Sequence, residues 1–182
     1  ITAGTLASGI WDRDEMSLFI DLGTNGEIVF GNRDFLMSCA CSAGPAFEGG
    51  DSSCGMRATD GAIEACTIDK NTMEPTLTIV GDPGQKCVGI CGSGMFVKEG
   101  SRIRRDHHGM GRYVLAEASE SETEREISIN EVDIDNFIRA KGAIFSAIDT
   151  LLKSVDMTVD GIDDVYVAGG IGSGINMGNA VN

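Results

Sequence analysis

The chain has 182 residues, of which 42% are hydrophobic, and a formal net charge of −14. This length is sufficient for one domain with a hydrophobic core. The acidic balance argues against a nucleic-acid partner, because phosphate contacts need clustered Lys and Arg, and no apolar run approaches the ~20 residues of a membrane span. The first residues read as the end of a helix and the last as the start of one. We therefore expect residues 1–182 to be a single lobe of a longer protein.

The cysteines predict a reduced, cytoplasmic environment. The chain has six of them: Cys39, Cys41, Cys54, Cys66, Cys87 and Cys91. None forms the closely spaced pair typical of zinc or iron–sulfur sites, and nothing indicates secretion. We interpret them as small buried hydrophobic residues. Cys39 and Cys41 are expected on the same face of one strand.

The first third of the chain predicts an antiparallel β-meander. Residues 17–21, 27–31 and 34–40 read as short strands joined by turn-forming segments. Residues 41–61 follow as a long segment rich in Gly, Ser and Asp, and a loop of this length is usually functional or mobile. Two further β-like segments follow at 62–68 and 75–80, and residues 89–95 are expected to open a short helix.

Residues 100–126 are polar and predict irregular structure, including the basic stretch "SRIRRDHH", which we interpret as a solvated loop rather than a docking surface. Asn130 is expected to cap a long helix ending near Asp156, with Asp133 at the third helical position in a pattern close to a capping box. Its apolar residues form one predicted stripe: Ile134, Phe137, Ile138, Ile144, Phe145, Ile148, Leu151, Leu152 and Val155. A buried strand over 162–170 completes an α/β protein with a mixed sheet.

The turn "DLGTNGE" (21–27) is longer than a hairpin requires, because Asn25-Gly26 would suffice. Glycines in a hairpin tip let backbone N–H groups approach an anion. An acid beside phosphates normally serves a hydrated Mg²⁺ or orients a water. The alternative is a structural hairpin in which Asp21 bonds its own turn.

Two later glycine turns are weaker signals. "GICGSG" (89–94) offers Gly92, Ser93 and Gly94 as a second anion loop or as a plain tight turn. "AGGIGSG" (168–174) directly follows a predicted buried strand, and glycines placed there let a flat ligand lie against the backbone. Close packing of helix on strand is the alternative.

Several blocks together closely resemble the ATP-dependent reductive activators of corrinoid proteins. These blocks include "FIDLGTNGEIVFGN", "CSAGPAFEGG", "CGMRATDGAIE", "GICGSG", "DIDNFIRAKGAIF" and "VYVAGGIGSGIN". The resemblance implies an actin-like ATPase (ribonuclease H-like) lobe with an antiparallel β-meander and flanking helices. It implies ATP and Mg as cofactors and a corrinoid protein as partner. In the full-length protein it also implies a [2Fe-2S] domain, absent from this chain, that delivers an electron to Co(II).

The resemblance also assigns roles to residues. Asp21 would be catalytic and hold Mg²⁺ through a water. Phosphate would be bound by Gly23, Thr24, Asn25, Gly26 and Glu27. Adenosine would be bound by Gly169, Gly170 and Gly172, with Lys141 of the long helix beside it. Lys141 reads equally as a lysine with a buried stem and a solvated head.

Two departures from the family pattern stand out. The first lobe, with its own phosphate loop, is absent, so we expect the full-length protein but not this chain alone to hydrolyse ATP. After "GICGSG" the chain also passes almost at once to "VKEGSRIRRD", where the family has a longer apolar helix. A homodimer is possible. The alternatives that stay open are a small-molecule kinase lobe of the same superfamily and a non-catalytic docking or metal-binding module.

Overall fold

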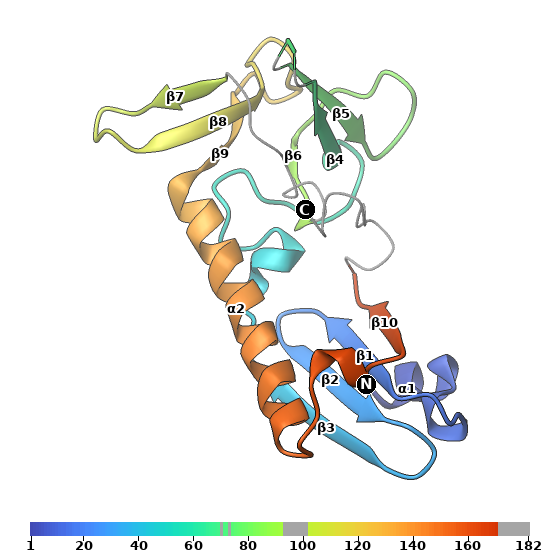
Figure 1. The fold of residues 1–182 in the computed structure, drawn as a ribbon. Helices are drawn as coiled ribbons and strands as arrows, with labels where there is room; N and C mark the ends of the chain where they lie inside the picture. The colour runs from blue at the N-terminus through green and yellow to red at the C-terminus, as the bar shows by residue number, and fades with distance from the viewer. Residues whose placement is uncertain (70, 73, 93–101, 171–182) are drawn as a thin grey trace. The chain divides into compact units, whose positions relative to one another are not determined.

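The computed structural model describes residues 1–69, 71–72, 74–92 and 102–170. The chain divides into two compact units (Figure 1). Among the described residues, unit 1 comprises 1–44 and 139–170, and unit 2 comprises 45–138. Helix α2 (Glu131–Lys153) begins in unit 2 and ends in unit 1.

Unit 1 is built on a four-stranded sheet in the order β10-β1-β2-β3. Its strands are β1 (Ser17–Leu22), β2 (Gly26–Gly31), β3 (Leu36–Cys41) and β10 (Asp164–Ala168). The first three strands pair antiparallel, whereas β10 pairs parallel with β1. The predicted meander and the predicted mixed sheet are both confirmed.

Helices cover both faces of this sheet. A Cβ added to Gly4 in α1 (Thr2–Ser8) would lie 2.1 Å from the ring of Phe19. This helix and the short η1 (Ile10–Asp12) therefore cover the face that carries Phe19. The other face meets α2, because a Cβ on Gly26 would lie 3.1 Å from Ile144. Alternation of side chains along each strand thus sends apolar residues toward a helix on either side.

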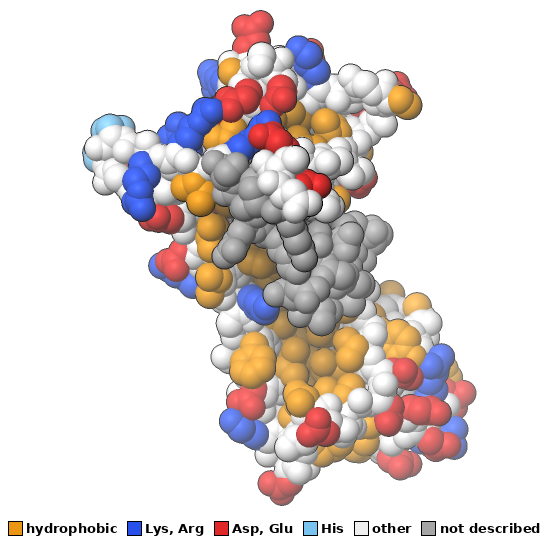
Figure 2. Space-filling model, turned by 45° about the horizontal axis from the view of Figure 1, so that its top comes forward, with side chains coloured by type: hydrophobic (Ala, Val, Ile, Leu, Met, Phe, Trp, Pro, Cys, Tyr) orange, Lys and Arg blue, Asp and Glu red, His pale blue; other side chains and the backbone are white. Residues whose placement is uncertain are grey.

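The β10 edge of the sheet keeps apolar side chains exposed. Phe145, Val159 and Val165 are 65%, 61% and 56% exposed. These three side chains border a hollow of about 340 Å³, together with Leu18 and other residues. Hydrophobic side chains also gather on the face of unit 1 seen in Figure 2. The η4 turn (Val159–Gly161) leads the chain from α2 into β10.

Unit 2 contains two three-stranded sheets, ordered β5-β4-β6 and β7-β8-β9. Their strands are β4 (Ala62–Ile68), β5 (Pro75–Ile79), β6 (Gly89–Ile90), β7 (Ile103–Arg105), β8 (Gly111–Ala116) and β9 (Ile127–Asn130). One core joins the two sheets through buried Ile63, Ile90, Leu115 and Ile127. The η2 turn (Pro45–Glu48) adds Phe47, whose ring lies 4.9 Å from that of Phe137.

The prediction of irregular structure over 100–126 was wrong for 103–105 and 111–116, which are strands, whereas 117–126 forms turns and bends. The basic stretch forms β7, and β7 and β8 make a hairpin whose tip carries exposed His107 and His108. The charged residues that suggested a solvated loop form ion pairs with one another instead. Glu126 accepts hydrogen bonds from Arg104 at 2.6 Å and from Arg112 at 2.8 Å. Exposed edge strands are commonly charged in this way.

The predicted capping box at the start of α2 is confirmed. Asp133 N–H donates to Asn130 Oδ1, and Asn130 N–H donates to Asp133 Oδ2, both at 2.9 Å. The predicted apolar stripe is buried only in part. Ile144, Leu151 and Leu152 are buried, whereas Ile134, Ile138 and Phe145 are 48%, 59% and 65% exposed. The helix ends at Lys153, three residues before the expected end. No helix in the described ranges combines the length and the apolarity that crossing a membrane requires.

Candidate functional site

The turn between β1 and β2 brings two carboxylates to one face of the sheet. Asp21 and Glu27 are direct partners in the antiparallel register, and such partners project to the same side with Cβ atoms ~5 Å apart. Like charges placed this way repel each other. The pair would therefore attract a cation. Paired carboxylate oxygens are also the ligand type that Mg²⁺ prefers.

The turn itself is closed by backbone hydrogen bonds. Gly23 N–H donates to the Asn25 carbonyl at 3.1 Å, and Gly44 N–H donates to the Thr24 carbonyl at 3.0 Å. Thr24 and Asn25 are exposed at the tip, whereas Gly26 is buried. A Cβ on Gly26 would lie 2.9 Å from Cys41 Sγ. The need for glycine at position 26 therefore comes from packing against β3 and α2.

The end of β10 meets this turn. Asp21 is the register partner of Ala168. A Cβ on Gly169 would lie 2.1 Å from the Leu22 carbonyl oxygen, and Gly169 has φ +103°, a conformation that favours glycine. Only a glycine lets the two backbones approach so closely. The structure thus places the start of the predicted adenosine turn directly against the predicted phosphate turn.

Gly170 differs from its neighbour. No described atom lies within 4 Å of a Cβ built on it. Packing among the described residues therefore does not explain a glycine at this position. Gly172, the third predicted adenosine residue, lies outside the described residues, and so do Ser93 and Gly94 of the second predicted anion loop.

Two other predicted site residues have different surroundings. A Cβ on Gly92 would lie 1.6 Å from the Phe47 carbonyl oxygen, so tight packing inside unit 2 accounts for this glycine. Lys141 is exposed on the part of α2 that belongs to unit 1. Its contact with adenosine stays a prediction.

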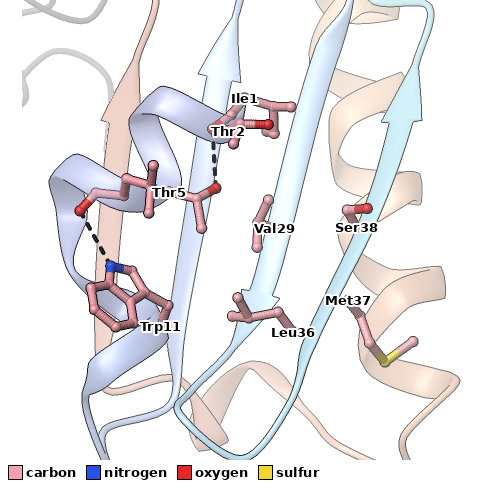
Figure 3. Close-up of a pocket in the computed structure, with 9 residues that line it drawn as sticks. Ile1, Thr2, Thr5, Trp11, Val29, Leu36, Met37 and Ser38 are labelled. Atoms are coloured by element: carbon pink, nitrogen blue, oxygen red, sulfur yellow. Dashed lines mark hydrogen bonds between the residues drawn. The ribbon is translucent and has the colours of Figure 1, made fainter.

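A second hollow of unit 1, shown in Figure 3, lies on the face covered by α1. Its volume is about 300 Å³, and Val29, Leu36 and Trp11 are among its lining residues. Trp11 Nε1–H donates to the Leu6 carbonyl at 3.4 Å. The lining side chains are apolar or hydroxyl-bearing, without a charged group. This hollow is therefore unsuited to a phosphate.

None of the six cysteines, all of which lie in the described residues, is part of a disulfide. Burial raises the pKa of Cys66 to about 11, and it also raises the pKa values of Cys39, Cys41 and Cys87. Cys39 and Cys41 share the face toward α2, as predicted, because Cys39 Sγ lies 3.9 Å from the Ala147 carbonyl. In the described part of the chain no three His, Cys, Asp or Glu side chains gather as a metal site would need.

A polar cluster in unit 2 was not predicted from the sequence. Asp133 is 2% exposed and accepts hydrogen bonds from Ser53 as well as from its helix cap. A capping box is readable from sequence. The bond to a residue 80 positions earlier is not, because it depends on the folded path of the 41–61 segment.

Comparison with known proteins identifies the family. A family model described as the C-terminal domain of RACo, the ASKHA domain, matches residues 15–99 and 95–182. The chain belongs to the RACo C-terminal domain family. A solved structure titled reductive activator for corrinoid, iron-sulfur protein matches 99% of the chain with a TM-score of 0.88 and 43% identity. The predicted actin-like fold and the resemblance to corrinoid activators are confirmed.

Two curated relatives agree with this family. The chain is 29% identical to the corrinoid activation enzyme RamQ of Eubacterium limosum and 28% identical to the [Co(II) methylated amine-specific corrinoid protein] reductase of Methanosarcina barkeri. Each match covers 91% of this chain. The chain spans about a third of each relative, 32% and 34%, and 31% of the solved protein.

The matches also bear on the short segment after "GICGSG". The family model matches in two stretches that meet at residues 95–99. The alignment with RamQ runs over 192 residues but uses 91% of this chain, which is about 166 residues. The relative therefore has about 26 residues that face gaps in this chain. A shortened segment after "GICGSG" stays a prediction.

Proposed function

We propose that this chain is the nucleotide-binding lobe of an ATP-dependent activase that reductively reactivates a corrinoid protein from Co(II) to Co(I). The observation that carries the proposal is the packing of Gly169 against Leu22. This contact brings the residue that follows β10 against the turn that follows β1, in a chain of the RACo C-terminal domain family. The names of the relatives, corrinoid activation enzyme and corrinoid protein reductase, supply the reaction. They favour it over the kinase-lobe and docking-module alternatives.

The acidic pair fits a hydrated Mg²⁺. Asp21 and Glu27 offer hard carboxylate oxygens on one face of the sheet. A carboxylate only accepts hydrogen bonds, so we assign Glu27 to the metal rather than to phosphate oxygens. When bound, Mg²⁺ would neutralise phosphate charge and hold water. Asp21 would orient that water, and Thr24 and Asn25 at the exposed tip would donate to phosphate oxygens.

The nucleoside end of ATP would lie at the turn after β10. Among the described residues nothing fills the space beside the Gly170 backbone, so a flat base or ribose could approach there. We also assign Gly172 and Lys141 to the binding of adenosine. Because the chain holds one phosphate turn of the two that this fold uses, we propose that ATP hydrolysis requires the full-length protein.

The electron for Co(II) would come from a [2Fe-2S] domain outside this chain. One electron converts Co(II) to Co(I), and ATP binding and hydrolysis would help to drive this uphill step. Cytoplasmic location fits the six free thiols. It stays a prediction, as does a homodimer.

The test uses the full-length protein with its corrinoid partner and a low-potential electron donor under anaerobic conditions. Formation of Co(I) is followed by its absorbance with Mg-ATP, with Mg-ADP and without nucleotide. We expect Co(I) only with ATP, and a raised KM for ATP in Gly170→Val with an unchanged melting temperature. Equal Co(I) formation without nucleotide would contradict the proposal.

A further inference from the structure

Unit 2 contains a hollow of about 340 Å³ that lies between two segments of its own chain. Residues 53–56 line one side of it and residues 123–127 line another, with Val88 and Gly89 between them in the sequence. All of these residues belong to unit 2. Hollows of this size are typical of sites for small ligands. Its walls, its floor and its charge decide what it can hold.

The wall formed by residues 53–56 is fixed by hydrogen bonds within unit 2. Ser53 N–H donates to Asp133 Oδ1 at 2.9 Å, and Ser53 Oγ–H donates to Asp133 Oδ2 at 2.8 Å. Ile90 N–H donates to the Cys54 carbonyl, and Met56 N–H donates to the Ile90 carbonyl, both at 2.8 Å. Hydrogen bonds to a carboxylate are strong ones. This wall is therefore held in place before any ligand arrives.

The wall formed by residues 123–127 is also fixed. Glu122 N–H donates to the Cys87 carbonyl at 2.8 Å, immediately before this wall. Ile127 is 2% exposed in the core of unit 2 and anchors the other end. The hollow is therefore preformed on both sides.

A strained backbone residue stands in or beside each wall. Asp51, two positions before Ser53, has φ 56°, and Glu124 has φ 54°. In the described part of unit 2 these are the two residues other than glycine with a positive φ. Such conformations are rare outside glycine, and they gather at functional sites, where the surrounding structure maintains them. This strain is what a ligand site would lead us to expect.

The floor of the hollow is apolar. A Cβ on Gly89 would lie 3.0 Å from Met56 Sδ, so the glycine lets the Met56 side chain lie against the backbone. Val88, which is 36% exposed, also lines the hollow. A thioether is polarisable and adapts to the shape of an apolar guest. The floor is therefore suited to a short apolar chain.

The charge of the lining selects an anion. Glu126 is already neutralised, because Arg104 lies 2.6 Å from its Oε2 and Arg112 lies 2.8 Å from its Oε1. Arg125 lines the hollow too, and among the described residues it forms no ion pair. A guanidinium matches the two oxygens of a carboxylate. A phosphate dianion would bring more negative charge beside Glu126 than one guanidinium balances, so a monoanion is favoured.

We propose that this hollow binds a carboxylate that carries a short apolar chain. The carboxylate would pair with Arg125, and the chain would lie on Met56 and Val88. A free organic acid and an acidic peptide side chain flanked by apolar residues present this same chemistry. The site lies wholly within unit 2, so it does not depend on nucleotide binding at the β1–β2 turn.

Binding is tested on the full-length protein by saturation-transfer difference NMR, with sodium pentanoate as the probe at constant ionic strength. We expect saturable binding to the wild type and a Kd raised tenfold or more in Arg125→Gln, the effect of losing roughly one charge-assisted hydrogen bond. Arg105→Gln is the matched control, because it removes the same charge from an exposed residue of unit 2 that does not line the hollow. It should bind pentanoate as the wild type does.

Two further probes of the wild type separate the parts of the ligand. Pentanamide keeps the chain and lacks the charge, and acetate keeps the charge and lacks the apolar chain. Each should bind about tenfold more weakly than pentanoate, or weaker still. Absence of saturable pentanoate binding, equal Kd values for the wild type and Arg125→Gln, or equal binding of pentanoate and either probe would overturn the proposal.

A blocked tripeptide with glutamate between two leucines identifies the source of the carboxylate. Displacement of pentanoate by this peptide at a lower Kd would assign the site to an acidic segment of a protein. Weaker binding of the peptide would assign it to a free organic acid. Either result supports a carboxylate site only if Arg125→Gln weakens the binding of the tighter ligand, and an unchanged Kd in that variant would contradict it.

Discussion

The β1–β2 turn of unit 1 and the 45–56 segment of unit 2 are both rich in glycine and small polar residues, but they differ in the hydrogen bonds that hold them. In unit 2 the loop is bonded by Asp133, Asn136 and Ile90. In unit 1 the turn is closed by two backbone bonds, and Thr24 and Asn25 remain exposed beside a carboxylate pair. Polar groups that the fold itself satisfies serve the scaffold. Exposed turn residues beside a carboxylate pair are within reach of a ligand.

The glycines also differ in whether packing within the fold requires them. A Cβ on Gly55 in unit 2 would lie 1.7 Å from the Gly49 carbonyl oxygen, and one on Gly169 in unit 1 would lie 2.1 Å from that of Leu22. Both positions require glycine for packing. No atom of the described residues fills the space beside Gly170. Residue type alone does not separate a packing glycine from one that a ligand approaches.

The largest effect is expected at Gly169. Gly169→Ala places a Cβ against the Leu22 backbone at φ +103°, and we expect a loss of about 3 kcal/mol or more in the free energy of unfolding. Denaturant unfolding of the full-length protein measures this loss. Gly170→Ala is the matched control and should unfold as the wild type does. Equal destabilisation by both substitutions would remove the distinction between the two glycines.

A second difference between the units lies in their thiols. Cys66 is 2% exposed in the core of unit 2, and burial raises its pKa from 9.0 to about 11. The folded state therefore keeps this proton while the unfolded state loses it. The corresponding stability is present below pH 9 and is lost as pH rises toward 11. Two pKa units correspond to at most roughly 2–3 kcal/mol.

Stability measured by denaturant unfolding between pH 8 and pH 11 tests this expectation. The wild type should lose stability across this window more steeply than Cys66→Ala, which has no thiol to titrate at this site. Cys41→Ala in unit 1 is the control and should keep most of the wild-type slope. Identical slopes for the wild type and Cys66→Ala would contradict the assignment.

The smallest effect is expected at the surface of α2 in unit 1. Lys153 Nζ lies 2.7 Å from Asp149 Oδ2, four residues earlier, with the lysine 72% exposed. Lys153→Ala should cost no more than about 0.5 kcal/mol and less at high salt. Thermal unfolding at low and high salt measures this cost. A loss well above 1 kcal/mol would show that Lys153 has a further structural role.

The sequence predicted the parts whose pattern is local. Alternation and turn residues located the meander, and Asn130 with Asp133 located the start of α2. The β7–β8 hairpin was missed because β8 is held by the burial of Leu115 and Ala116 in the core of unit 2 and by pairing with β9, and both depend on the folded path of the chain. The contact of Gly169 with Leu22 could not be predicted from spacing, because the two residues meet only when β10 pairs with β1. From the sequence alone Gly169 and Gly170 look alike, because both are glycines in the same turn. The path of the folded backbone is what distinguishes them.

Asp21→Asn in the full-length protein tests the central claim, that the β1–β2 turn holds a phosphate–metal cluster. The substitution keeps the side-chain shape and removes the charge. Steady-state ATP turnover, nucleotide affinity and melting temperature are measured side by side, with Asp149→Asn as a control on α2. We predict that turnover falls by ~10²-fold or more, because losing one preorganised electrostatic group at a transition state typically costs a few kcal/mol, while affinity falls less and the melting temperature is nearly unchanged. Wild-type turnover in Asp21→Asn would contradict the claim.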